Sequence, residues 1–489
     1  MRGEANIYTL CGAPSRALSL LPGGDAPGCM AFHAGARQSL PDIHKCCRHI
    51  GLYMPNEDRG TPTPGTKLRR ELGLPAVTLS GIGIILGAGI YALLGEAAGM
   101  AGNAVWLTFA VAAAIAAFSA LGYAELSSMF PRASAEFEYV RNAFGRGLAF
   151  VVGWLIIFSG ILGAATVSLG FAGYFSDLVG FPPLPSAILL LLVLAGILFY
   201  GIKETARAAI AMTLVEVGGI VMVILIGLPH LGRVDYFEMP LGVPGLLQAS
   251  ALVFFAYMGF EEMVKLSEET RDPERTIPIA LIIALAVSVL LYILVSLAAV
   301  SVVGWEQLAA SRAPFAEVAS VALGPAAFTV ISVIALFATA NTALLMMMAS
   351  SRITYGMASS FSLPSILARV HPRTRTPWTA IVAVLLASIA FLFAGEIDFV
   401  ANVTNFTLFV TFVVINAAVI LLRYRAPEVA RPFRIPGSIG RFPVIPAVGI
   451  VSTLLLLAQL ELLVLLIGGM VVVIGAAIAL VGTRRPPSA

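Results

Sequence analysis

Runs of about twenty apolar residues recur along the chain from Leu72 onward, and they constrain its fold more than any other feature. A helical run of this length spans the hydrocarbon core of a bilayer. Strands of a membrane barrel would instead alternate apolar and polar residues. Only 12% of the residues are charged, whereas soluble domains carry about 25%. The sequence therefore predicts an all-α, polytopic membrane protein with one membrane domain.

About twelve membrane spans are predicted from the apolar runs. The third and eighth runs exceed the length that a bilayer requires, which indicates tilted or protruding helices. The spans lie near 72–98, 104–129, 147–177, 185–202, 206–229, 245–268, 277–303, 325–357, 378–395, 398–422, 443–461 and 463–482.

Basic residues gather in every second loop between these spans. The alternate loops contain few of them, with Arg233 after the fifth span and Arg312 after the seventh. Since cytoplasmic loops are enriched in Lys and Arg, both termini are predicted to lie in the cytoplasm of a plasma or inner membrane protein. The basic loops and ends contain Arg69, Arg70, Arg132, Arg141, Arg146, Lys203, Arg207, Arg271, Arg275, Arg369, Arg373, Arg375, Arg423, Arg425, Arg431, Arg434, Arg441, Arg484 and Arg485.

Residues 1–66 differ in kind from the rest, being rich in Gly, Pro, Arg and Cys without periodicity. Their apolar stretch at 17–21 is too short for a signal peptide. A disordered tail, a regulatory tail and upstream sequence translated from a wrong start are the alternatives, and the first and third are favoured. All four cysteines precede Met54, so the spans contain no thiol, and neither a metal site nor a cofactor is predicted.

The first span contains four glycines within nine residues, at Gly81, Gly83, Gly87 and Gly89. Glycine is a poor helix former, costing up to about 1 kcal/mol relative to alanine. A break at membrane depth is tolerated only where it faces protein or a water-filled cavity. The N–H groups at the start of the second half-helix then attract an anion. We therefore predict a helix break at 87–89 that holds a carboxylate.

A second interruption occurs in the sixth span at 254–260, followed by Glu261 and Glu262. The two interruptions lie five spans apart, and an odd number of spans reverses the direction of the chain across the membrane. This predicts inverted repeats at 67–230 and 231–424, followed by two more spans at 425–489. Paired interrupted spans point to the binding site of a secondary transporter. The alternative is that these glycines only allow close helix packing.

Four motifs, in this order, resemble those of the amino acid–polyamine–organocation (APC) superfamily of transporters. The resemblance is closest to the branch of bacterial and cationic amino acid permeases, and it covers the chain from about Leu72 onward. The motifs lie at 83–91, at 123–131, at 254–260 together with 267–278, and at 351–358.

This resemblance implies a five-plus-five, inverted-repeat LeuT-like fold with broken helices 1 and 6, two extra C-terminal helices, and alternating access. It places the carboxylate-binding turn at 87–89, an aromatic cap at Phe255 and a gating acid at Glu261. Main-chain carbonyls near the breaks would accept hydrogen bonds from the substrate ammonium. The substrate-binding residues implied in this way are Ile85, Gly87, Ala88, Gly89, Phe254, Phe255, Ala256, Met258 and Gly259.

Glu216 lies in the middle of the fifth span, where a charge costs roughly 2.5–3.5 kcal/mol. The resemblance to proton-coupled permeases of this family implies a lysine here, so the acid is a departure from the family pattern. A proton carrier, a sodium ligand and a structural pair remain the alternatives. Asn341 and Thr342 are polar groups in the eighth span that either line the site or bond across helices.

The leading interpretation is a secondary active transporter for neutral amino acids, by proton-coupled uptake or exchange. Sodium coupling, or transport of cationic amino acids or polyamines, is the alternative, and a transporter-like amino acid sensor is the alternative of another class. An enzyme is not predicted, because the spans lack a nucleophile cluster and a metal cluster. The chain also lacks a Walker A pattern, so ATP-driven transport is not predicted. The expected partners are an amino acid, a proton or sodium ion and lipid, without nucleic acid, in a monomer or homodimer.

Overall fold

The computed structural model describes residues 72–132, 135–200, 202–359, 363–374 and 376–482. The N-terminal segment 1–66 and the basic residues Arg69, Arg70, Arg375, Arg484 and Arg485 lie outside this part of the chain, so the predictions made for them stay untested. The described residues all belong to one compact unit.

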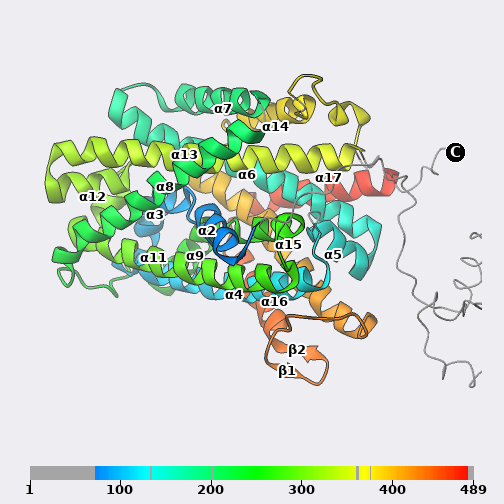
Figure 1. The fold of residues 1–489 in the computed structure, drawn as a ribbon. Coiled ribbons are helices and arrows are strands. Elements are labelled where there is room, and N and C mark those ends of the chain that lie inside the picture. Colours follow the sequence, from blue (N-terminus) through cyan, green and yellow to red (C-terminus); the bar gives the residue numbers. More distant parts are fainter. Residues whose placement is uncertain (1–71, 133–134, 201, 360–362, 375, 483–489) are drawn as a thin grey trace, which may run out of the picture. The chain divides into compact units, whose positions relative to one another are not determined.

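The described chain is almost entirely helical, with one two-stranded antiparallel hairpin (Figure 1). The first half contains α2 (Leu74–Ile85), α3 (Gly89–Ala101), η3 (Gly102–Ala104), α4 (Val105–Met129), α5 (Ala135–Phe144), α6 (Arg146–Val179), α7 (Pro183–Tyr200), α8 (Ile202–Gly227) and η4 (Leu228–His230), where η marks a 3-10 helix. The second half contains α9 (Gly242–Val253), η5 (Phe254–Tyr257), α10 (Phe260–Met263), η6 (Val264–Glu269), α11 (Pro273–Ala310), α12 (Pro314–Leu323), α13 (Pro325–Ser359), η7 (Ser365–Ala368), α14 (Trp378–Phe391), α15 (Ile397–Arg425), β1 (Ser438–Ile439), β2 (Phe442–Pro443), α16 (Val444–Leu457) and α17 (Leu462–Gly482).

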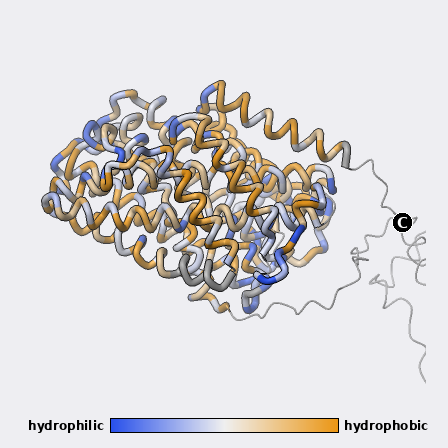
Figure 2. Tube along the Cα trace, turned by 90° about the horizontal axis from the view of Figure 1, so that it is seen from above, coloured by the Kyte–Doolittle hydropathy of each residue, from blue (hydrophilic) through white to orange (hydrophobic). Residues whose placement is uncertain are grey.

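Nine helices in the described residues are long and apolar enough to cross a membrane. Apolar residues run along these helices, and hydrophilic residues concentrate at the turns that join them (Figure 2). Each predicted span coincides with one helix or with a succession of shorter helices, such as α9, η5, α10 and η6 in the sixth span. The chain is thus consistent with a polytopic membrane protein, whereas the number of spans stays a prediction.

Helices α6 and α13 pack along each other in the interior of the bundle. The Ser350 hydroxyl of α13 donates a hydrogen bond of 3.2 Å to the Ile157 carbonyl of α6. The Ser388 hydroxyl of α14 donates a similar bond of 3.0 Å to the Ile161 carbonyl. Small polar side chains therefore join neighbouring helices in this otherwise apolar core.

The short helices α5 and α12 lie between long helices and were not predicted from the sequence. Helix α5 carries Glu136, Glu138 and Arg141 beside buried apolar residues, so its amphipathic pattern is too short and too polar to be read as a span. Helix α12 lies against α11, α13, α8 and α3.

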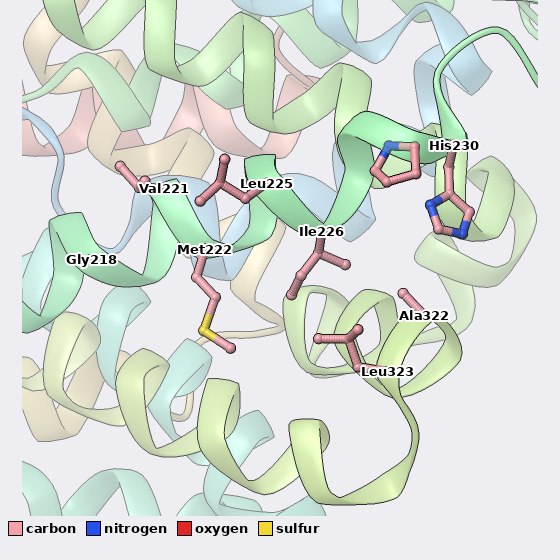
Figure 3. Close-up of a pocket in the computed structure, with 9 residues that line it drawn as sticks. Gly218, Val221, Met222, Leu225, Ile226, His230, Ala322 and Leu323 are labelled. Carbon is pink, nitrogen blue, oxygen red and sulfur yellow. The ribbon is translucent and has the colours of Figure 1, made fainter.

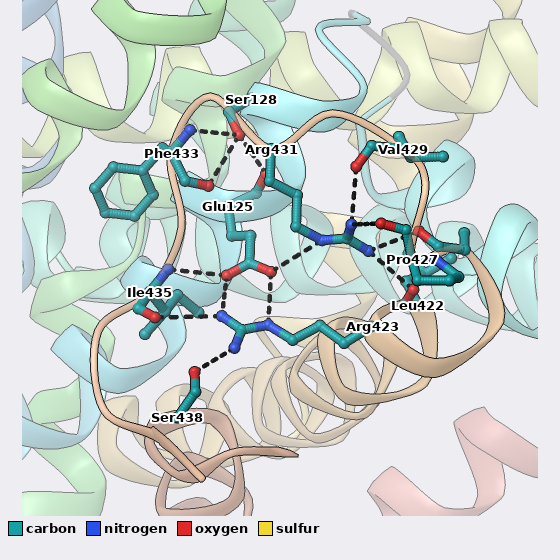
Figure 4. A network of polar contacts seen from close by, with 11 residues as sticks. Glu125, Ser128, Leu422, Arg423, Pro427, Val429, Arg431, Phe433, Ile435 and Ser438 are labelled. Atoms are coloured by element: carbon teal, nitrogen blue, oxygen red, sulfur yellow. Dashed lines mark hydrogen bonds and ion pairs between the residues drawn. The ribbon is translucent and has the colours of Figure 1, made fainter. Parts of the chain in front are cut away.

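A buried ion pair holds the loop after α15 against the end of α4 (Figure 4). Glu125 of α4 accepts two hydrogen bonds from the Arg423 guanidinium, at 2.9 and 2.5 Å, and a third from the Ile435 main-chain N–H at 2.9 Å. Arg431 adds a second guanidinium 3.6 Å from the same carboxylate. Glu125 and Arg423 are 1% and 4% exposed, so this bidentate pair is both desolvated and well satisfied.

A main-chain contact ties the start of α2 to the segment that follows η6. Leu72 and Thr270 form a parallel bridge. The Arg271 N–H donates to the Leu72 carbonyl at 2.8 Å. The two interrupted helices described below are therefore connected at their outer ends.

We predict that Glu125→Ala lowers the free energy of unfolding by about 3–5 kcal/mol, because Arg423 is left buried without its partner. A double-mutant cycle with Arg423→Met in detergent measures this coupling. The control is Glu138→Ala, which breaks an ion pair whose Arg141 and Glu138 side chains are 30% and 17% exposed, and it should cost about 0–1 kcal/mol. Equal losses at the two positions would contradict the prediction.

Candidate substrate site

The first interruption separates α2 from α3 at residues 86–88. The Leu86 N–H still bonds to the Ile82 carbonyl at 2.8 Å, which closes the last turn of α2. The Ala88 N–H instead donates to the Thr342 hydroxyl of α13 at 2.8 Å. A side-chain oxygen from another helix thus satisfies a main-chain donor at the start of α3.

The second interruption runs from the end of α9 to α10. The 3-10 turn at η5 is followed by Met258 in an extended conformation and by Gly259 with φ of 117°. Only glycine adopts this φ without strain. The Gly259 N–H donates to the Glu261 carboxylate at 2.9 Å, so the acid caps the turn from which it projects.

These two interruptions touch each other through backbone. A Cβ atom added to Gly89 would lie 2.5 Å from the Ala256 Cα, and one added to Gly259 would lie 2.8 Å from the Ile84 carbonyl oxygen. A side chain at either position would collide with main chain, which cannot rotate away. Glycine at 89 and 259 therefore allows the two breaks to lie in contact.

The carbonyls near both breaks are bonded by side chains from other helices. The Tyr292 hydroxyl of α11 bonds to the Ile85 carbonyl at 2.6 Å and to the Ala256 carbonyl at 2.9 Å. The Asn405 amide of α15 donates to the Ala251 and Leu252 carbonyls at 2.7 and 3.1 Å. Both side chains are completely buried, and neither was predicted as a site residue.

Glu216 is completely buried on α8, and it faces α13. The Asn341 amide donates to the Thr213 hydroxyl at 3.0 Å and, more weakly, to the Glu216 carboxylate at 3.5 Å. The Tyr91 hydroxyl of α3 donates to the Glu216 main-chain carbonyl at 2.8 Å. The Glu216 Oε1 and Asn341 Oδ1 atoms have no hydrogen-bond partner among the described residues.

The structure thus gathers most of the predicted residues around the breaks. Asn341 and Thr342 are consecutive on α13, so they connect the Glu216 group to the Ala88 N–H. Phe255 and Met258 are buried at the second break. Phe254 instead packs against Phe409 of α15, with ring centroids 4.9 Å apart.

Glu261 lies beside a second group of charges near the end of α10. Lys265 bonds to Glu262, and its ammonium lies 4.0 Å from the Glu136 carboxylate of α5. Glu136 is 3% exposed. Burial raises the pKa of the Glu136 carboxyl above its ordinary value, and the nearby Lys265 opposes this rise.

Two cavities lie away from the breaks. An apolar cavity of about 650 Å³ is lined by α8 from Gly218 to Ile226, by His230 and by the end of α12 (Figure 3). A polar cavity of about 560 Å³ is lined by Asp177, Arg312, Glu317 and their neighbours. Neither cavity contains a predicted substrate-binding residue.

Polar residues isolated inside apolar spans are the signal that could have identified the missed groups. Tyr292 follows Leu290 and Leu291, and Asn405 lies within the tenth predicted span. Polar groups at such depth are costly unless they have partners, so each indicates a specific contact. Their partners lie 36 to 207 positions away, which sequence alone does not identify.

Buried breaks in apolar helices, with main-chain groups bonded by side chains of other helices, are typical of membrane transporters. The family model for amino acid permeases matches residues 72–482. The chain therefore belongs to the amino acid permease family. This confirms the resemblance to the APC superfamily and indicates a transporter rather than an enzyme.

The chain is similar to individual transporters that are named for different substrates. The chain is 30% identical to the branched-chain amino acid permease BcaP of Bacillus subtilis over 432 residues, which are 83% of this chain and 91% of the relative. It is 31% identical to the methylthioribose transporter of the same organism, covering 81% and 89% of the two chains. It is 30% identical to the vacuolar cationic amino acid transporter 2 of Arabidopsis thaliana, covering 74% and 61%.

We predict that Gly89→Ala destabilises the protein by about 1–3 kcal/mol, because the new methyl group meets the Ala256 main chain. The matched control is Gly218→Ala in α8, where a Cβ would have no atom within 4 Å. Alanine there should stabilise the helix by about 0.5–1 kcal/mol. Thermal unfolding in detergent measures both changes, and the same sign for the two variants would refute the prediction.

Glu136→Gln should raise the melting temperature relative to wild type, and this gain should grow between pH 5 and pH 8. A carboxyl whose pKa is raised on folding favours the folded state at low pH, and that contribution is lost as the pH rises through the folded-state pKa. Melting curves across this range provide the measurement. Glu138→Gln on the same helix is the control, and a gain independent of pH would contradict the prediction.

Proposed function

We propose that the protein is a secondary active transporter that carries neutral amino acids across a membrane by alternating access. The substrate would bind where the α2–α3 and α9–α10 interruptions meet. Its carboxylate would face the N-terminus of α3 at Gly87, Ala88 and Gly89, and its ammonium would face the carbonyls of Ile85 and Ala256. The observation that carries this proposal is the direct contact between the two breaks.

The side chains at the breaks support an apolar substrate. Ile85, Phe255 and Met258 are buried there. The carboxylate of Glu261 accepts the Gly259 N–H, so it is engaged within its own turn. The branched-chain amino acid specificity named for BcaP points to aliphatic side chains. The Arabidopsis cationic amino acid transporter makes cationic substrates the alternative.

The arrangement in sequence supports the repeat organisation that we propose. Helices α2 and α3 open the segment 67–230, and α9 and α10 occupy the corresponding place in 231–424. The segment 425–489 would contribute two additional spans. The alternating basic loops favour cytoplasmic termini in a plasma or inner membrane.

We further propose that Glu216 carries the coupled proton. Its Oε1 atom and the Asn341 Oδ1 atom are buried acceptors without a donor, and protonation of the carboxyl would supply one. Asn341 is adjacent to Thr342, which bonds to the Ala88 N–H at the substrate site. Protonation of Glu216 would therefore act on the α2–α3 break through Asn341 and Thr342. Sodium would instead use these oxygens as ligands.

The direct test is a thermal-shift screen of purified protein against the twenty amino acids, followed by uptake in proteoliposomes. Stabilisation by aliphatic amino acids together with counterflow is the expected result. A preference for arginine and lysine would favour the cationic alternative. Binding without counterflow would favour a sensor, and stabilisation by none of the twenty would overturn the proposed function.

For Glu216→Gln we expect loss of accumulation driven by a pH gradient while counterflow persists, because glutamine keeps the side-chain size but cannot carry the proton. Radiolabelled uptake with and without the gradient measures this separation. The control is Glu317→Gln in the polar cavity, where Glu317 accepts a hydrogen bond from Gln307 at 2.6 Å. Sodium-driven, pH-independent uptake by the wild type would reject proton coupling.

A further inference from the structure

The Tyr292 hydroxyl bonds to both helix breaks at once. It lies 2.6 Å from the Ile85 carbonyl oxygen of the first break and 2.9 Å from the Ala256 carbonyl oxygen of the second. These distances are those of ordinary hydrogen bonds. A single atom from α11 therefore occupies the position from which a ligand would contact both carbonyls.

One hydroxyl cannot fully satisfy these two acceptors. It has one proton to donate, whereas each carbonyl oxygen accepts hydrogen bonds. An ammonium group has three N–H donors and a positive charge, and charge-assisted hydrogen bonds are roughly twice as strong as neutral ones. Replacing the hydroxyl by an ammonium would thus improve the bonding of both carbonyls.

The Tyr292 hydroxyl lies in tightly packed surroundings. Tyr292 is completely buried, and its ring lies 5.3 Å from the Tyr257 ring and 5.6 Å from the Phe109 ring. The backbone contact between Gly89 and Ala256 closes the neighbouring space. A ligand ammonium that bonds to both carbonyls would therefore compete with the hydroxyl for these oxygens.

We infer that the Tyr292 hydroxyl is an internal competitor for the substrate ammonium, and that amino acid binding displaces it from the Ile85 and Ala256 carbonyls. This inference rests on the proposed substrate site. Tyr292 then acts as a specificity determinant, because only a ligand with a protonated amine compensates for the two lost contacts. Displacement also transmits site occupancy to α11, which packs against α2, α3, α4 and α8.

The test compares amino acid affinity in wild type, Tyr292→Phe and Tyr174→Phe. Tyr174 is the matched control, since it is equally buried and donates to the Tyr91 carbonyl at 3.0 Å, away from the break carbonyls. The probe is the amino acid that stabilises wild type most, L-leucine on the proposal above. Its deaminated analogue, 4-methylpentanoate, serves as the ligand without an ammonium.

Tyr292→Phe should bind the amino acid about fivefold more tightly than wild type, since the ligand no longer displaces a hydrogen bond worth about 1 kcal/mol. Tyr174→Phe should bind it as wild type does. Unchanged or weaker binding by folded Tyr292→Phe would overturn the inference, and so would an equal gain for 4-methylpentanoate. Wild type that binds no amino acid would instead overturn the proposed function.

A structure of wild type with the amino acid bound provides a second measurement, which does not depend on the folding of any variant. The expected result is a Tyr292 hydroxyl beyond hydrogen-bond distance of the Ile85 and Ala256 oxygens, with the ligand nitrogen in its place. A bound amino acid beside a hydroxyl that still contacts both oxygens would overturn the inference.

Discussion

The need to satisfy main-chain polar groups away from water governs this structure. A continuous helix bonds its own N–H and C=O groups, but each interruption of α2–α3 and α9–α10 releases several of them. Thr342, Tyr292 and Asn405 bond to these groups from α13, α11 and α15. The geometry of the two breaks therefore depends on the packing of α11, α13 and α15 around them.

The same polar groups give the breaks their chemical character. A main-chain donor or acceptor that bonds to a side chain of another helix can exchange that partner for a ligand. A main-chain group that is bonded within a regular helix cannot. The first break offers an N–H to Thr342 and a carbonyl to Tyr292, which are one donor and one acceptor on the same short turn. A zwitterion has the complementary pair of groups on one carbon. The family membership and this local geometry consequently agree on the substrate class.

Features that depend on neighbouring residues could be predicted from the sequence, whereas contacts between residues far apart in the chain could not. Helix ranges follow from local apolar runs, and the positions of the interruptions follow from glycines and from the motif at 254–260. The side chains that bond to the breaks do not follow from the local sequence, because Tyr292 lies 207 positions from Ile85. The pairing of Glu125 with Arg423, 298 positions away, is likewise not encoded in the local sequence. The short amphipathic helix α5 was missed because its apolar face covers only part of a span's length.

The bridge between Leu72 and Thr270 has a mechanical consequence. Helices α2 and α10 are joined at their outer ends by the Arg271–Leu72 hydrogen bond, and near the breaks by the contact of Gly259 with Ile84. Because α2 and α10 are attached at two points, neither helix can tilt without moving the other. Any movement at this end of the bundle that leaves both attachments intact must therefore carry α2 and α10 together.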